Sequence, residues 1–139
     1  MSKTVKIELT DREFRRLLDL VYVGNWIMNS TREEDRIPDY DELESKIFAH
    51  CRDNGADALF EEEDGVAYPS AAFQEGGIHE AIADYEDQVF FEILAEELAR
   101  RDMGFEPVTS QNFEELAARI DDYISEFEEN GLGNITLSE

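Results

Sequence analysis

FEELAARIDDYISEF, residues 113–127, decides the fold class of this chain. Its apolar side chains recur at the period of one face of an α-helix, without a break over four turns. That face comprises Phe113, Leu116, Ala117, Ile120, Tyr123, Ile124 and Phe127. Val108 and Phe113 can pack together across Thr109 at the helix start, and Gly131 supplies its end. The stretch therefore predicts an amphipathic helix that buries its apolar face.

Two further helices are predicted in the first half of the chain. The first runs over about residues 11–28, because Thr10 and Glu13 have the spacing of a capping box. From Leu17 onward this helix is apolar on nearly all sides. The second helix follows Pro38, with Asp39 expected as its N-cap, and stops at Asn54-Gly55.

Another helix is predicted over about residues 78–102. Arginines occupy its last turn, where cations suit the helix dipole, and Gly104 lies just beyond it. Its predicted inner face consists of Ile78, Ile82, Tyr85, Val89, Phe90, Ile93 and Leu94. This gives four helices in all.

Short strands complete the predicted fold. VKIELT (5–10) and NITLS (134–138) alternate apolar and polar residues, which is the period of a half-buried strand. In LFEEEDGVAYP (59–69), the pair Asp64-Gly65 favours a two-residue hairpin turn of type I′. We therefore expect one domain over residues 1–139 with a mostly helical α+β fold. Four helices surround one core, with a small sheet from the terminal strands and the central hairpin.

Charge is the outstanding feature of the composition, with a net value of −23 in 139 residues. Residues 1–30 carry five basic and four acidic side chains, so residues 31–139 carry −24. A field of this sign repels nucleic acid and anionic lipid, so direct binding to nucleic acid or to a membrane is not expected. A basic protein is the expected partner. The candidate partner-binding residues form two acidic clusters, Glu61, Glu62, Glu63 and Asp64, and Asp121, Asp122, Glu126, Glu128 and Glu129.

The apolar stretch of the first helix suggests self-association. Residues 1–30 are nearly neutral, so repulsion between two copies is lowest there. We expect a homodimer through Val21, Tyr22, Trp26 and Ile27. Charged residues interrupt the N-terminal stretch and Cys51 is a single cysteine, so a cytoplasmic location without disulfides is predicted.

The motifs argue against several chemistries. A calcium loop with Gly65 at its sixth position would have Phe60 first and Ala71 twelfth, and neither offers a side-chain oxygen. His79-Glu80 lacks the second histidine of a zinc-protease helix, because Ala83 stands in its place. No catalytic, cofactor-binding or metal-binding residues are therefore predicted, and no cofactor.

The leading interpretation is a small acidic, non-enzymatic interaction or regulatory protein that binds a basic partner, in its sharper form as a nucleic-acid mimic. The alternative enzyme is a Mg²⁺-dependent phosphohydrolase that uses helical carboxylates such as Glu92 and Glu96, which are one turn apart. A third interpretation is that the charge serves solubility alone.

Overall fold

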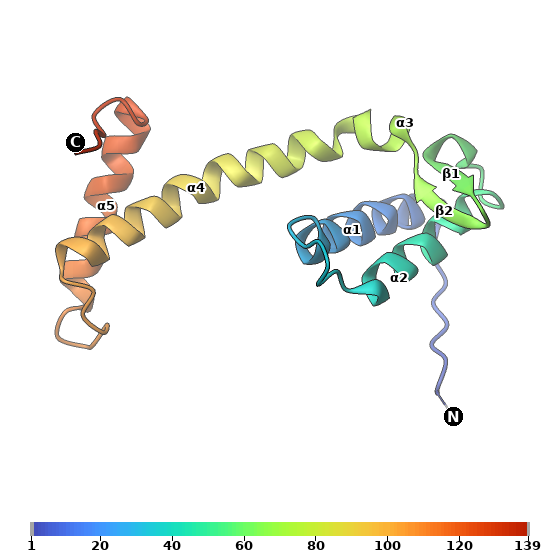
Figure 1. The fold of residues 1–139 in the computed structure, drawn as a ribbon, viewed down its shortest axis with the longest axis horizontal. Helices are drawn as coiled ribbons and strands as arrows, with labels where there is room; N and C mark the ends of the chain where they lie inside the picture. The colour runs from blue at the N-terminus through green and yellow to red at the C-terminus, as the bar shows by residue number, and fades with distance from the viewer. Residues whose placement is uncertain (1, 139) are drawn as a thin grey trace. The chain divides into compact units, whose positions relative to one another are not determined.

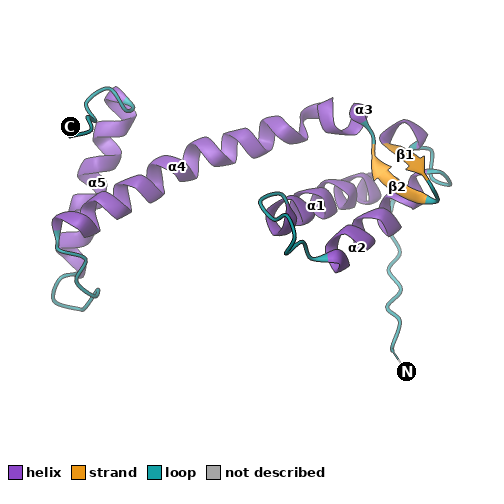
Figure 2. Ribbon diagram, viewed as in Figure 1, coloured by secondary structure: helices purple, strands orange, loops and turns teal. Residues whose placement is uncertain are grey.

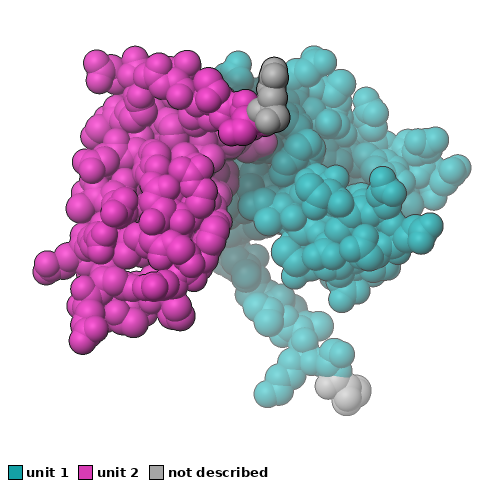
Figure 3. Space-filling view, turned by 60° about the vertical axis from the view of Figure 1, so that its left-hand side comes forward, with its two compact units in different colours: residues 1–82 teal, residues 83–139 magenta. Residues whose placement is uncertain are grey.

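The computed structural model describes residues 2–138 and divides the chain into two compact units, Met1–Ile82 and Ala83–Glu139 (Figure 3). We call them unit 1 and unit 2 and describe each by itself. The predicted mostly helical α+β fold is confirmed. Among the described residues there are four long helices and one antiparallel sheet of two strands (Figure 2).

Helix α1 of unit 1 spans Asp11–Asn29. The predicted capping box is present: the Glu13 amide donates to the Thr10 hydroxyl at 3.2 Å, and the Thr10 amide donates to the Glu13 carboxylate at 2.9 Å. These bonds occupy two backbone donors that a helix start otherwise leaves free. The start of α1 is thus set by residues that are adjacent in sequence.

Helix α2 spans Pro38–Phe48 and packs against α1 (Figure 1). A short 3₁₀ turn, Ala49–Cys51, continues it. The prediction that Asp39 is the N-cap is wrong. Ile37 occupies the N-cap position without a side-chain hydrogen bond to the helix, and Pro38 is the first helical residue. Proline suits that place because its fixed φ is already helical and its missing N–H is not needed there. Asp39 lies in the first turn instead.

The sheet is a hairpin of β1, Phe60–Glu63, and β2, Val66–Pro69, and a 3₁₀ turn, Asp57–Leu59, precedes it. Asp64 and Gly65 have φ values of 53° and 79°, the positive pair that a type I′ turn requires. The predicted hairpin is confirmed. The expected terminal strands are wrong, since residues 2–10 and 134–138 form no strand in the structure.

The core of unit 1 lies between α1, α2 and the hairpin. Leu18, Phe48 and Cys51 are completely buried in it. The rings of Tyr22 and Phe48 both meet the ring of Phe73 edge-on, with centroids 5.3 Å and 5.0 Å away. Burial raises the pKa of the Cys51 thiol.

Phe73 ends α3, Ala71–Phe73, and a π-helical turn, Gln74–Ile78, follows it. Gly77 within that turn has a φ of 112°, which other residues rarely adopt. Helix α4, His79–Asp102, begins directly after it. The first four residues of α4 belong to unit 1 and the remainder to unit 2.

Unit 2 consists of the rest of α4 and helix α5, Phe113–Asn130, which ends at Gly131 as predicted. Asn112 is the N-cap of α5. Val108 and Phe113, which were expected to pack together across Thr109, are 53% and 60% exposed. The buried residues of unit 2 are Ala95, Ala99, Leu116 and Phe127. The contiguous cluster in unit 1 does not include them.

Candidate functional site

Helix α4 has apolar side chains on two sides within unit 2. One side packs on α5: the rings of Phe91 and Phe127 lie 5.5 Å apart, and Ala95 and Ala99 are completely buried. These two alanines are one turn apart, on the same side of α4 as Phe91. The contact between α4 and α5 accounts for the residues that are buried in unit 2.

The other side of α4 is exposed to solvent. Tyr85, Phe90 and Ile93 are 62%, 48% and 58% exposed, and Val89 is half-buried among them. Tyr85, Val89 and Ile93 follow each other at intervals of four residues, so they share one face. We call these four residues the bare face of α4. The prediction that Tyr85, Phe90 and Ile93 are buried is wrong, because α5 packs on a different side of α4.

Carboxylates lie beside and within the bare face. By helical spacing, Glu92 and Glu96 lie near Tyr85, while Glu86 and Glu97 lie between Ile93 and Phe90, and all four are exposed. Unit 2 carries 16 acidic and three basic residues in its sequence, a balance of −13. The surface thus combines apolar side chains with negative charge.

The three arginines of unit 2 are already paired with carboxylates of the same unit. Arg100 lies 3.6 Å from Glu97, Arg101 lies 2.9 Å from Asp102, and Arg119 lies 3.0 Å from Glu115. Tyr123 also donates a hydrogen bond to Asp102. Tyr123 and Arg101 together hold the pKa of the Asp102 carboxyl below its usual value. Most carboxylates of unit 2 have no such cationic neighbour among the described residues.

The acidic cluster expected on α5 is on the surface. Asp121, Asp122, Glu128 and Glu129 are exposed. Glu126 differs, because it accepts hydrogen bonds from Asn130 at 2.6 Å and Asn134 at 2.7 Å. These two amides lower the pKa of Glu126. Glu126 therefore holds the end of the chain against α5 as well as adding charge.

The other expected cluster lies on the hairpin of unit 1. Glu61, Glu63 and Asp64 are exposed and have no basic partner among the described residues. Glu62 forms an ion pair with Arg52, whose guanidinium also lies over the Phe60 ring at 5.6 Å. The two acidic clusters thus belong to different units.

The residues expected at a dimer interface on α1 are divided between core and surface. Tyr22 is 7% exposed and shares a 2.6 Å hydrogen bond with the His79 ring. Val21 is half-buried, whereas Trp26 and Ile27 are 38% and 63% exposed. The exposed residues of the set, and not Tyr22, are available to a second copy.

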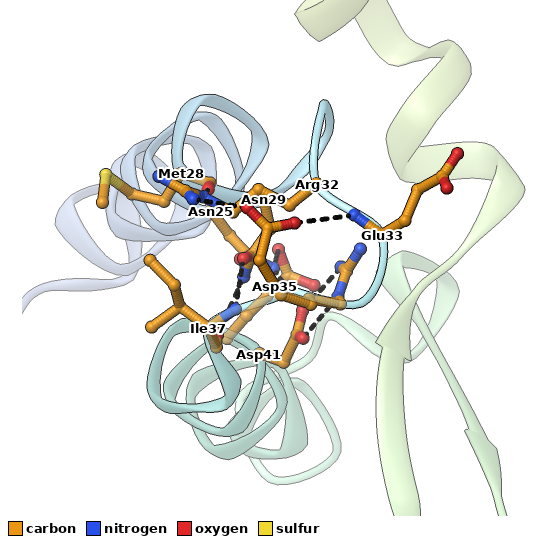
Figure 4. A network of polar contacts seen from close by, with 10 residues as sticks. Asn25, Met28, Asn29, Arg32, Glu33, Asp35, Ile37 and Asp41 are labelled. Carbon is orange, nitrogen blue, oxygen red and sulfur yellow. Dashed lines mark hydrogen bonds and ion pairs between the residues drawn. The ribbon is translucent and has the colours of Figure 1, made fainter.

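A polar network between α1 and α2 was not predicted. Asn29 is completely buried, and its side chain bonds both backbone groups of Ile37: it accepts from the amide at 2.8 Å and donates to the carbonyl at 2.9 Å (Figure 4). It also donates to the Asn25 side chain at 2.8 Å. Asn25 in turn donates to Asp41 at 3.0 Å and to Glu44 at 3.1 Å.

The two carboxylates of this network have opposite pKa shifts. Arg36 donates two hydrogen bonds to Asp41, at 2.6 Å and 2.7 Å, and this contact lowers the Asp41 pKa. Burial raises the pKa of Glu44, which has a hydrogen bond from Asn25 but no ion pair. The network fixes the loop between the helices through the buried Asn29 amide and through the ion pair of Arg36 with Asp41. Two asparagines one turn apart on an otherwise apolar helix are the sequence pattern that could have revealed it.

The described residues contain no group of three or more side chains placed to hold a metal ion. Glu92 and Glu96 are exposed on α4. Within residues 2–138, no helix has both the length and the apolar character needed to cross a membrane. Comparisons with protein-family models, with curated proteins and with solved structures found no match.

Proposed function

We propose that this protein is a non-enzymatic interaction protein that binds a basic partner, and that the partner lays an amphipathic segment on the bare face of α4. The observation that supports the proposal most strongly is the pairing of exposed apolar side chains with carboxylates on one helix face. Exposed apolar clusters of this kind are typical of docking sites.

The apolar contribution is moderate. Full burial of one large apolar side chain is worth roughly 1.5–3 kcal/mol. Tyr85, Phe90 and Ile93 have about half of their surface left to bury, so their burial would supply about 3–4 kcal/mol before the entropy of association is counted. This amount does not give a tight complex by itself. Charge complementarity has to add to it.

The charge selects a basic partner. The arginines of unit 2 are already engaged with carboxylates, so the balance of −13 faces solvent with little local compensation. A second copy of unit 2 would bring the same charge to the contact, and like charges across an interface are unfavourable. A helix with apolar residues on one side and lysines or arginines at its margins fits both properties of the face.

A nucleic-acid mimic is the sharper form of this proposal. The carboxylates of α5 support it, since a basic nucleic-acid-binding protein would be attracted to such an array. The apolar side chains of the bare face favour a partner that also has an apolar surface. The charge then accelerates association and the apolar contact determines where the partner stays.

A peptide experiment tests the proposal. The probe is an 18-residue amphipathic helix of leucine and lysine, compared with a scrambled peptide of the same composition. We expect the amphipathic peptide to bind more tightly and to weaken as salt rises, because surface charges are screened within about 8 Å at physiological ionic strength. Isothermal titration calorimetry measures both affinities.

Two matched variants locate the site. Ile93→Ser should weaken binding of the amphipathic peptide about fivefold to tenfold, which corresponds to roughly 1 kcal/mol of lost apolar contact. Ile27→Ser is the control, because Ile27 is equally exposed on α1 of unit 1. Equal affinities for the two variants, or for the two peptides, would contradict docking on α4 and leave a solvent role for the charge.

A further inference from the structure

The hairpin has one edge with unpaired backbone groups. Glu63 faces Val66 beside the turn, and Glu61 faces Tyr68. In a hairpin with a two-residue turn, the pair beside the turn exchanges both backbone hydrogen bonds, and every second pair repeats this. The N–H and C=O groups of Phe60 and Glu62 therefore point away from β2, and they have no backbone partner elsewhere among the described residues.

The opposite edge, along β2, is closed. Its outward-pointing amide, that of Ala67, donates to the Ser45 hydroxyl on α2 at 3.1 Å. The next outward position is Pro69, which has no N–H. Only β1 therefore offers a ladder of donors and acceptors to another strand.

The same chain carries a matching strand at its N-terminus. Residues 3–9, KTVKIEL, alternate in the way a half-buried strand does. They form no strand in the structure, and Val5 and Ile7 are 84% and 74% exposed. Both side chains are therefore open to a partner strand.

Charge restricts the register between these two segments. Pairing Lys6 with Glu61 brings opposite charges face to face and is favourable. It also places Val5 and Ile7 on the face of the hairpin that carries Phe60, because side chains alternate between the two faces. Pairing β1 with another β1 would oppose glutamates and is disfavoured.

We propose that residues 3–9 of a second copy add to β1 as a third strand, so that two copies exchange their N-terminal segments. Exchange between copies is favoured over pairing within one chain by the capping box at Thr10. Its two hydrogen bonds with Glu13 hold Thr10 extended, with φ and ψ of −70° and 166°, and the segment leads away from the hairpin of its own chain (Figure 1).

Disulfide trapping tests this pairing. The variants Lys6→Cys and Glu61→Cys are prepared separately, one of them labelled with ¹⁵N, then mixed and oxidised gently. Residues directly opposite each other in a sheet can have Cβ atoms as close as about 4.5 Å, which is at the upper end of the range for a disulfide. Cys51 is completely buried and stays out of the reaction while the protein is folded.

We expect the mixed K6C–E61C disulfide in at least tenfold excess over the product of K6C with the control variant Glu42→Cys. Glu42 is an exposed carboxylate on α2 of the same unit. Deletion of residues 2–9 should also reduce the mass measured by light scattering from dimer to monomer. Equal yields for the two mixtures would overturn the proposal, and so would a double variant K6C/E61C that closes within a single chain.

Discussion

Replacing Asn29 with alanine should lower the free energy of unfolding of unit 1 by about 2–3 kcal/mol. The side chain makes three hydrogen bonds, two to the backbone of Ile37 and one to Asn25, and none of its surface is exposed. At about 1 kcal/mol for each bond the loss is roughly 3 kcal/mol, and the better helix propensity of alanine returns about 0.5 kcal/mol. Such a loss is a large part of the stability of a small domain.

Urea titration followed by Trp26 fluorescence measures this change, because Trp26 is the single tryptophan and belongs to unit 1. With a slope of about 1–3 kcal/mol per molar urea, the midpoint should fall by roughly 1–2 M. Asn54→Ala is the control: Asn54 donates to the His50 carbonyl at 2.7 Å, but in an exposed position where water replaces the bond. Its midpoint should stay near that of the parent. If the urea midpoints of both variants fall equally, the buried hydrogen bonds between Asn29 and Ile37 do not stabilise unit 1.

Four other outcomes follow from the structure. Burial raises the pKa of Glu44, so the ionised carboxylate destabilises the folded protein at pH 7. Glu44→Gln should therefore raise the urea midpoint at pH 7. This gain should vanish below about pH 4, because the glutamate is then protonated in both the folded and the unfolded state. Increasing concentrations of MgCl₂ should give no saturable rise in Tm, whereas a single saturable rise would favour the hydrolase alternative. Glu62 and Glu126 have hydrogen-bond or ion-pair partners and are left unchanged in the next test. Amide substitutions of the other carboxylates in each acidic cluster should slow association of the basic peptide at low salt without changing Tm. The two effects should add, because the clusters lie in different units; unchanged rates would leave the charge with a role in solubility. If the exposed α1 residues, and not the N-terminal segments, join two copies, Ile27→Ser should lower the mass found by light scattering at tens of micromolar protein, and deletion of residues 2–9 should leave it unchanged.

The features that were predictable from the sequence depend on near neighbours. Thr10 and Glu13 form their capping box within one turn, and Asp64-Gly65 forms its turn from two adjacent residues with positive φ. The stripe of α5 is equally local, since its period is a property of the helix itself. In each case the pattern that reveals the structure lies in residues close together in the sequence.

The errors concern residues whose partner lies elsewhere. Alternation in residues 5–10 predicts a strand, but a strand exists only where a second one lies beside it. The burial expected for Tyr85 and Ile93 needed knowledge of which side of α4 the next helix covers. The acidic clusters were placed on the surface correctly, since carboxylates without cations stay in water. Their arrangement in two units could not be derived from composition.

The complete burial of Cys51 gives unit 1 a built-in kinetic probe. A thiol reagent can modify this side chain only when unit 1 opens locally or unfolds. Since no other thiol is present, the labelling rate counts these opening events without interference from unit 2. Comparing the rate with and without a bound ligand would show which unit the ligand protects, before any contact residue is known.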